Sequence, residues 1–367
     1  MNPASIEAAR SVAGSFAIDG ELIEIVPLTR GHIHDTFVST WNVGSHRLRY
    51  LHQHMNADVF RDIVGLMHNI ERVTTHLHVT PSGADALETL VLVPTREGST
   101  YLDCDLGHWR TYHYIDGTRS YDQCQDAEMA HEAALAFGRF QARLSDLDPR
   151  DLREIIPSFF SSPHRLDQFD QALAADRAGR ASSCAKWIEF VQARREMVQP
   201  IQERLDDGRI PIRVIHGDTK LNNVLFDENG HRARAVVDLD TCMPGYSLYD
   251  FGDLVRFTAA TSREDEQDLS RAGVDLELYG ALVCGYLEGI GGSLNDEERA
   301  LMPFAARLVT LTIGMRFLAD HLAGDVYFKV SREGHNLDRA CVQFRMVEVM
   351  EELQAEMDVR HILESRA

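Results

Sequence analysis

The stretch Val214-Ile-His-Gly-Asp-Thr-Lys-Leu-Asn-Asn-Val-Leu-Phe226 sets a polar loop between two apolar runs. Each run is short and rich in branched or aromatic residues, so each predicts a strand. Inside the loop, Asp218 and Asn223 are five residues apart, and Lys220 lies between them. Loops that are held between rigid strands often carry catalytic residues. This loop is therefore the first candidate site.

The residue types in the loop match the requirements of phosphoryl transfer. Transfer from ATP needs a carboxylate that orients the acceptor hydroxyl, oxygen ligands for Mg²⁺, and a cation near the γ-phosphate. Asp218 suits the base, and Lys220 suits the cation. Because Mg²⁺ prefers carboxylate and amide oxygens, Asn223 and one further aspartate would complete the set.

The next apolar run, Ala235-Val-Val-Asp-Leu-Asp240, supplies that aspartate. Asp238 follows Asp218 by 20 residues, about the separation of the catalytic and metal-binding aspartates in kinases. A His-Gly-Asp triplet alone is common, and an aspartate at a strand end is often only a cap or part of an Asx-turn. The joint pattern is more specific, and it favours a kinase over a purely structural loop.

A second candidate for the metal-binding aspartate is Asp250, in the triplet Asp-Phe-Gly that protein kinases use. It lies 32 residues after Asp218 and follows Met-Pro-Gly at 243–245, which we interpret as a turn and not as a strand. The spacing and the preceding turn both differ from the kinase pattern. We therefore expect Asp238, and not Asp250, to bind the metal.

The chain changes character near residue 115. Before it, apolar runs typical of strands dominate, with one helical stretch at 59–77; the runs are 22–28, 37–41, 48–51, 90–94 and 109–115. Beyond residue 120 the pattern is mostly helical, at 126–144, 164–207, 276–290, 297–322 and 337–359. We expect an α+β fold: a small β-rich lobe at 1–115, a hinge near 112–117 and a larger helical lobe at 116–367. A cleft between two lobes is a common ligand site.

Composition narrows the class of protein. The 367 residues are 44% hydrophobic and 26% charged, with a net charge of −20. Such an acidic surface repels phosphate backbones and anionic lipid, so nucleic acid and membranes are poor partners. We find no signal peptide and no long apolar span, and the six scattered cysteines lack a C-x-x-C motif. These features favour a cytoplasmic protein with free thiols.

The chain resembles the aminoglycoside phosphotransferase and choline kinase superfamily, which has a bilobal, protein-kinase-like fold. The resemblance is closest to its N-acetylhexosamine 1-kinase branch and spans most of the chain. The central motifs are H-G-D-T-K-L-N-N-V-L-F and V-D-L-D-T-C-M-P-G, followed by Y-D-F-G-D-L-V-R. Further motifs lie at 31–36 and at 314–328, where the sequence G-M-R-F-L-A-D-H-L-A-G-D-V-Y-F points to the sugar-kinase branch.

The resemblance implies a role for each acidic or amide residue of the central segment. Asp218 would be the catalytic base. Asn223 and Asp238 would bind Mg²⁺, and Asp240 would contact a second Mg²⁺. These roles agree with the assignment made from the residue types alone.

The resemblance also implies supporting and substrate-binding residues. His216 and Asp250 would support the catalytic loop, with Asp250 acting through hydrogen bonds and not as a metal ligand. Arg316 and Tyr327 would contact the acceptor from the helical lobe, and His34 would reach it from the other lobe.

Phosphate binding by the N-terminal lobe departs from the kinase pattern. Protein kinases place a lysine on the third strand, but the corresponding segment, 46–54, contains none. Arg49, His52 or His54 could serve in its place, and the resemblance suggests a position near Gln53 or His54. A histidine would be a weak substitute, since its ordinary pKa is near 6.5. The glycine loop is reduced to Gly31 in the segment 29–32.

We therefore expect an ATP- and Mg²⁺-dependent kinase whose acceptor is the anomeric C1 hydroxyl of N-acetylglucosamine or N-acetylgalactosamine. One alternative is a kinase of the same fold that acts on an aminoglycoside, choline or another amino alcohol, which the acidic composition permits. Another is a nucleotide-binding protein without turnover, for which the missing lysine argues. The sequence leaves open whether the protein is a monomer or a dimer.

Overall fold

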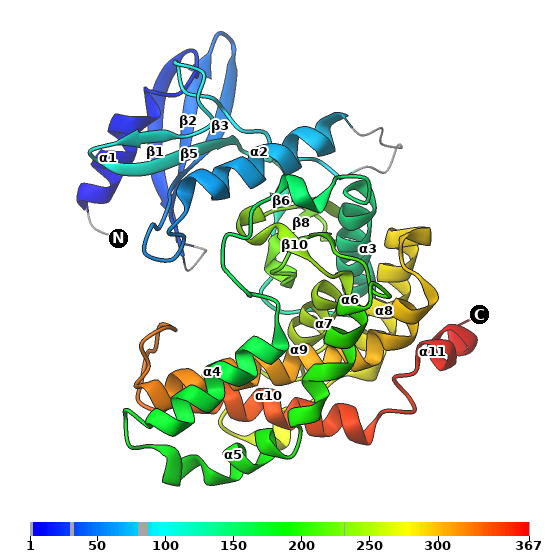
Figure 1. Ribbon diagram of the computed structural model, residues 1–367. Helices are drawn as coiled ribbons and strands as arrows, with labels where there is room; N and C mark the ends of the chain where they lie inside the picture. Colours follow the sequence, from blue (N-terminus) through cyan, green and yellow to red (C-terminus); the bar gives the residue numbers. More distant parts are fainter. Residues whose placement is uncertain (1–2, 30–32, 80–86, 231, 367) are drawn as a thin grey trace.

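A small antiparallel sheet and a larger helical part make up the molecule (Figure 1). The computed structural model describes residues 3–29, 33–79, 87–230 and 232–366. The sheet has the order β1-β2-β3-β5-β4. Its strands are β1 (Glu21–Leu28), β2 (Asp35–Val43), β3 (His46–His54), β4 (Leu102–Cys104) and β5 (Gly107–His113). The expected α+β architecture, with a β-rich N-terminal part and a helical C-terminal part, is confirmed.

One face of this sheet packs against helix α1 (Pro3–Ala13) and encloses a small apolar core. Side chains alternate between the two faces of a strand, so β3 presents Tyr50 and His52 to this core. Leu51 and Gln53 point to the opposite face. In the β3–β5 pairing, Gln53 lies opposite Arg110 and His52 lies opposite Thr111. The face that carries Gln53 and Arg110 is the one turned toward the helical part.

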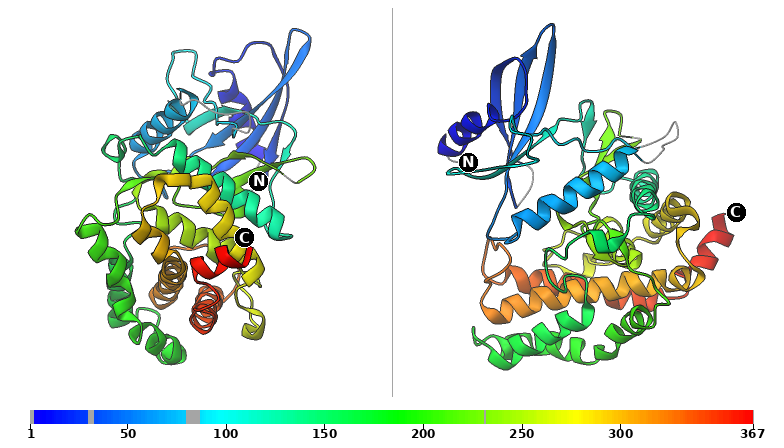
Figure 2. Two further views of the ribbon diagram at one scale, coloured as in Figure 1. Left: turned by 90° about the vertical axis from the view of Figure 1, so that its right-hand side faces the viewer. Right: turned by 45° about the horizontal axis from the view of Figure 1, so that its top comes forward.

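The helical part surrounds a second, much larger core. Helix α2, the stretch expected at 59–77, contributes to this core and lies between the sheet and the other helices (Figure 1; Figure 2). The helices are α2 (Ile63–Val79), α3 (Ala127–Arg143), α4 (Ser162–Ala175), α5 (Ala185–Gln192), α6 (Gln199–Asp206), α7 (Ser247–Thr258), α8 (Leu276–Ile290), α9 (Asp296–Ala323), α10 (His335–Glu352) and α11 (Val359–Arg366). The division of the chain at residue 115 stays a prediction.

Two small sheets hold the central loop in place. The first pairs β7 (Arg213–Ile215) with β10 (Met243–Gly245), and the second has the order β6-β8-β9. The strands of the second are β6 (Thr118–Arg119), β8 (Val224–Asp227) and β9 (Ala233–Val236). The interpretation of 243–245 as a turn was wrong, because this segment pairs antiparallel with β7 despite its proline.

The run at 90–94 was expected to be a strand, and this was also wrong. This run lies beside β5 and makes two backbone hydrogen bonds with it. Val93 N–H donates to the Thr111 carbonyl at 2.8 Å, and His113 N–H donates to the Val91 carbonyl at 2.9 Å. Only an isolated bridge between Leu92 and Tyr112 forms in this run. The next N–H that could continue this ladder is that of Thr95, but it donates to the Ser99 carbonyl at 2.8 Å, so the chain turns away from β5 after this short pairing.

Helix α9 is the one described helix that is long and apolar enough to cross a membrane by composition. In its most apolar window, 72% of the residues are buried inside the protein. It packs against α4, α7 and α10. A long apolar helix that other helices surround is a core helix.

Candidate active site

Asp250, in the first turn of α7, holds the loop between β7 and β8 through hydrogen bonds. The Asp250 carboxylate accepts the backbone N–H groups of His216 and Gly217, each at 2.8 Å, and the side-chain amide of Gln141 at 2.6 Å. The hydroxyl of Thr219 donates to the Asp250 carbonyl at 2.6 Å. Burial raises the pKa of Asp250, against the lowering effect of His216 and these donors. Asp250 thus fixes the start of the loop.

Gly217 allows the backbone of this loop to turn sharply and to pass close to Thr241 and Phe160. Its φ is +79°, and a Cβ at this position would lie 2.8 Å from the Thr241 carbonyl oxygen and 2.6 Å from a ring carbon of Phe160. A residue with a side chain would therefore be both strained and crowded. The glycine allows the backbone to turn directly before Asp218.

The ring of His216 ties the loop to the segment that carries Asp238. Its Nε2 lies 2.9 Å from the Val237 carbonyl oxygen, and its Nδ1 accepts the backbone N–H of Asp218 at 3.3 Å. These partners assign the proton to Nε2, because a carbonyl oxygen only accepts and a backbone N–H only donates. The ring itself packs edge-on against Phe137 and Phe140.

Asp218 lies between a cation and an amide. Its Oδ1 is 2.7 Å from the Nζ of Lys220. The Asn223 Nδ2 donates to the Asp218 carbonyl at 2.8 Å and to its Oδ2 at 3.2 Å. Desolvation by the surrounding protein acts to raise the pKa of Asp218. The positive charge of Lys220 and its hydrogen bond outweigh this effect, so the pKa of Asp218 lies below its usual range. Both partners of this ion pair are therefore charged near neutral pH.

Asp238 stands at the end of β9 in a left-handed conformation, with φ 64° and ψ 64°. For a residue other than glycine this conformation costs energy and is often found at functional sites. The residue is exposed to solvent, but neighbouring protein partly desolvates its carboxylate. This surrounding protein, and then the charges of Asp240 and Asp218, raise the pKa of Asp238. The region thus carries more negative charge than its neighbours neutralise.

This donor set fits Mg²⁺. The backbone N–H of Val237 donates to the Asn223 carbonyl at 2.9 Å, which joins the two segments that carry Asn223 and Asp238. Because the amide nitrogen of Asn223 faces Asp218, its Oδ1 remains as the oxygen for a cation. Within the described residues no group of three or more acidic, histidine or cysteine side chains forms a metal site. Mg²⁺ does not need one, since it commonly takes one or two carboxylates together with substrate phosphates.

Asp240 is bound by two residues of the N-terminal part. Its Oδ1 lies 2.6 Å from Nη1 of Arg110, and its Oδ2 accepts from Nη2 at 3.0 Å and from the Nε2 of His34. Burial acts to raise the pKa of Asp240, but Arg110 and His34 hold it well below the usual range. These contacts do not test the predicted role of Asp240 at a second Mg²⁺.

The structure separates the three residues predicted to replace the missing lysine. Gln53 lies on the cleft face of β3, where its Oε1 accepts from Nε of Arg110 at 2.9 Å. Arg49 instead pairs with Asp116, its Nε lying 2.6 Å from Oδ1. The ring of His54 stacks on Trp109 on the other face of the strand, with centroids 4.9 Å apart. Gly31 lies outside the described residues.

Arg110 was missed by sequence reasoning. The signal available was an arginine inside the otherwise apolar and aromatic strand Trp109–Tyr112, since a buried arginine is rare unless paired. Its partner Asp240 is 130 residues away in the chain, so the sequence offered no means of pairing them.

The predicted acceptor residues of the helical part lie together. The Arg316 guanidinium is 5.8 Å from the ring centroid of Tyr327 and 5.1 Å from that of Phe159. Tyr327 is 63% exposed, so its ring is available to a ligand. His34 contacts Asp240 and lies beside the ring of Phe60, with ring centroids 5.6 Å apart.

Two further residues of this region were not foreseen. Asp320 accepts the backbone N–H groups of Val326, Tyr327 and Phe328 at 2.8–3.0 Å. Arg165 lies with its guanidinium 5.5 Å from the Phe159 ring, and burial, then the charge of Arg316, lower its pKa to about 10. The first fixes the loop that carries Tyr327, and the second adds positive charge beside it.

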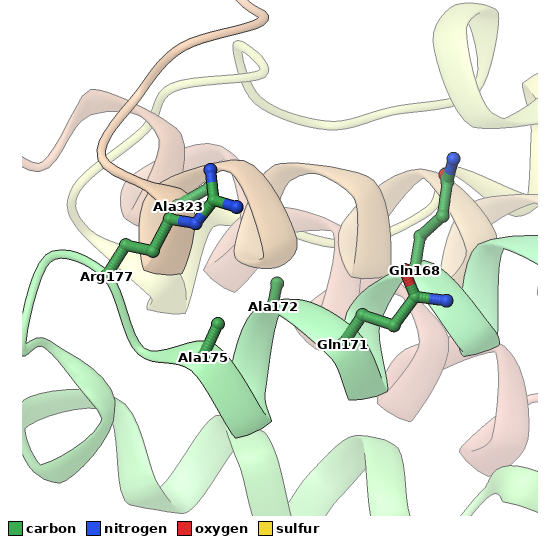
Figure 3. A pocket seen from close by; sticks show the side chains of 6 residues that line it. All are labelled: Gln168, Gln171, Ala172, Ala175, Arg177 and Ala323. Atoms are coloured by element: carbon green, nitrogen blue, oxygen red, sulfur yellow. The ribbon is translucent and has the colours of Figure 1, made fainter.

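A separate hollow of about 200 Å³ lies between α4 and the end of α9 (Figure 3). Its lining is small and neutral apart from one arginine; it consists of Gln168, Gln171, Ala172, Ala175, Arg177 and Ala323. It contains none of the residues described above. We assign the chemistry to the loop at Asp218 and not to this hollow.

Comparison with known proteins agrees with this geometry. The profile of the Phosphotransferase enzyme family matches residues 67–282. Among solved structures, choline kinase from Cryptosporidium parvum Iowa II is similar, with a TM-score of 0.58, 13% identity and coverage of 99% of this chain and 98% of that chain. A microcompartment-associated aminopropanol kinase gives a TM-score of 0.55 and 15% identity over 97% and 99% of the two chains. Spectinomycin phosphotransferase, solved with ADP and spectinomycin, gives 0.52 and 13% over 98% and 97%.

The fold and the site together define a small-molecule phosphotransferase that uses an alcohol group as acceptor, and the expected kinase-like fold is confirmed by these structures. At such low identities the solved structures establish only the fold. The family profile covers more than half of the chain. The chain therefore belongs to the Phosphotransferase enzyme family.

Proposed function

We propose that this protein is an ATP- and Mg²⁺-dependent kinase that phosphorylates the anomeric C1 hydroxyl of an N-acetylhexosamine. The observation that carries the proposal is the arrangement of Asp218, whose charged carboxylate lies between Lys220 and Asn223. The free thiols of the six cysteines fit a cytoplasmic protein.

The roles follow from charge and position. Asp218 has a lowered pKa, so it is ionised and can accept a hydrogen bond from the sugar hydroxyl and then its proton. Lys220 lies beside it and would offset charge on the transferred phosphoryl group. Asn223 and Asp238 would hold Mg²⁺, which would neutralise part of the charge of the phosphates. The contribution of the protein is then mainly positioning and electrostatics.

The acceptor assignment rests on the helical part. The motif at 314–328 that resembles the sugar-kinase branch contains Arg316, Asp320 and Tyr327, and these residues form one structural unit through the bonds of Asp320 to the loop. Aromatic rings next to arginine provide stacking surfaces and donors for sugar hydroxyls.

Charge argues against a cationic acceptor. Arg165 and Arg316 both lie against the Phe159 ring, and the charge of Arg316 lowers the pKa of Arg165. Two cations this close would repel choline or an aminoglycoside. The relatives named above include kinases of amino alcohols and of spectinomycin, so we expect this chain to differ from them in acceptor.

A reducing-end assay tests the proposal. The protein is incubated with ATP and Mg²⁺ and, in turn, with N-acetylglucosamine, N-acetylgalactosamine, choline, ethanolamine and spectinomycin, and ADP release is followed. Phosphorylation at C1 removes the reducing end, whereas phosphorylation at any other hydroxyl keeps it. ADP release with choline or spectinomycin but not with either sugar would replace our acceptor. Nucleotide binding without ADP release from any acceptor would favour a protein without turnover.

A further inference from the structure

The N-terminal part lacks a lysine on β3, yet one cation of its sheet reaches the catalytic centre. Arg110 on β5 is 1% exposed, and it lies directly opposite Gln53 of β3 in the sheet register. Because facing residues of paired strands project to the same side, Arg110 occupies the cleft face that a β3 residue at position 53 would use. The neighbouring strand therefore supplies the charge that β3 does not.

The guanidinium of Arg110 is held in one orientation. Nε donates to Gln53 at 2.9 Å, and Nη1 and Nη2 lie 2.6 and 3.0 Å from the two oxygens of Asp240. Nε and Nη2 make hydrogen bonds, whereas the short contact of Nη1 is an ion pair without hydrogen-bond geometry. Nη1 is buried and has no hydrogen-bond partner among the described residues, so its N–H groups remain to donate to a ligand.

Arg110 places its positive charge beside the segment that carries the predicted Mg²⁺ ligand Asp238. It contacts Asp240, which follows the predicted Mg²⁺ ligand Asp238 by two residues. Arg49, by contrast, lies with Asp116 and over the ring of Tyr114 at the connection to the helical part. Of the arginines on β3 and β5, Arg110 is thus the one near the predicted Mg²⁺ ligands.

We propose that Arg110 binds the phosphates of the nucleotide in place of the β3 lysine, and that Asp240 is its counter-ion and not a ligand of a second Mg²⁺. Gln53 and His34 are positioning residues in this arrangement, since Gln53 accepts from Nε of Arg110 and His34 contacts Oδ2 of Asp240. The inference rests on the proposed use of ATP, but not on the identity of the acceptor.

Nucleotide binding without turnover tests the role of Arg110. Calorimetry compares ADP with adenosine, which lacks phosphates, so that a phosphate contact is separated from binding of the base. Arg110→Gln alone removes the arginine partner of the buried Asp240 and risks unfolding. The decisive protein is therefore the double variant Arg110→Gln/Asp240→Asn, which keeps a neutral pair of similar shape.

We expect the double variant to bind ADP about tenfold more weakly or worse, the loss of a hydrogen bond to a charged group, and to bind adenosine as the parent does. Arg47→Gln, an exposed arginine on β3, is the matched control and should keep the ADP affinity. Parental ADP affinity in the double variant, or a loss confined to Arg49→Gln, would overturn the role of Arg110. If the parent itself binds ADP no better than adenosine, the proposed function fails instead.

The Mg²⁺ dependence of ADP binding tests the role of Asp240. For Asp240→Asn alone, we expect the Mg²⁺ concentration that gives half of the maximal enhancement to remain within about threefold of the parent, since a counter-ion is not a ligand. A rise of about tenfold or more would identify Asp240 as a metal ligand.

Discussion

The carboxylate of Asp250 accepts the backbone N–H of His216 at 2.8 Å, although 34 residues separate them in the chain. The same carboxylate also holds the next N–H of the loop. The aspartate of the Asp-Phe-Gly triplet therefore points toward the backbone of the loop that carries Asp218. This arrangement supports the interpretation of Asp250 as a residue that positions Asp218.

Asp250→Asn should lower kcat by about 100-fold and the free energy of unfolding by about 2 kcal/mol, because an amide cannot accept from both N–H groups and one buried donor loses its partner. Steady-state kinetics and urea denaturation measure the two effects. Asp275→Ala is the control: it removes an exposed helix cap on α8 and should cost about 1 kcal/mol with no change in kcat. Parental kcat in Asp250→Asn would exclude a positioning role.

Asp218→Asn should retain ADP binding and lose turnover by about 10³-fold, the usual contribution of a general base. The nucleotide is held by other groups, so its affinity should change by less than about threefold. Calorimetry with ADP and a coupled assay of ADP release separate the two properties. Turnover at the parental rate would show that another group takes the proton.

Asp320→Asn should raise the KM of the acceptor by about tenfold and leave the KM of ATP unchanged. Asp320 holds three successive N–H groups of the loop that presents Tyr327, and an amide would satisfy fewer of them. Asp296→Asn, at the exposed first turn of the same helix α9, serves as the control. An equal rise in both KM values would indicate a general loss of structure and not a local effect on the acceptor loop.

His52 should make the N-terminal part sensitive to acid. It is buried between the hydroxyls of Ser39 and Thr111, at 2.7 and 2.8 Å, and burial lowers its pKa to about 4 from 6.5. The folded protein therefore binds fewer protons here than the unfolded chain. Its contribution is complete above pH 6.5 and is lost as the pH falls toward 4, by about 3 kcal/mol at most. The melting temperature of the parent should drop more over this range than that of His52→Gln.

Gly285→Ala should lower the free energy of unfolding by about 2 kcal/mol, because helices α3 and α8 pack through glycines. A Cβ at Gly285 would lie 2.2 Å from the carbonyl oxygen of His131 in α3. Gly292→Ala is the matched control, since no atom lies within 4 Å of its Cβ position. Urea denaturation measures both variants. Equal stability of the two would mean that α3 moves away at little cost.

The spacing of the central segment was enough to predict the loop and its neighbours. Asp218, Asn223 and Asp238 lie within 21 residues, and the apolar runs around them form the expected short strands. Local information suffices here because the order of strand, loop and strand leaves few ways to arrange such short connections. Helices were predicted for the same reason: the apolar period of 3.6 residues is a local property, and Leu276–Ile290 forms a helix with the expected bounds.

The partners of distant residues could not be read in the same way. Alternation along a strand gives the face on which Arg110 lies, but it does not give the packing of that face against the segment that carries Asp240. The same holds for Asp320. Its carboxylate can accept the N–H of Tyr327 only because the chain reverses direction at Gly324. Such contacts depend on how whole elements pack, and packing is the sum of many weak interactions spread over the molecule. The predicted catalytic groups thus lie in one short stretch of sequence, whereas the packing of the fold brings the surrounding charges to them.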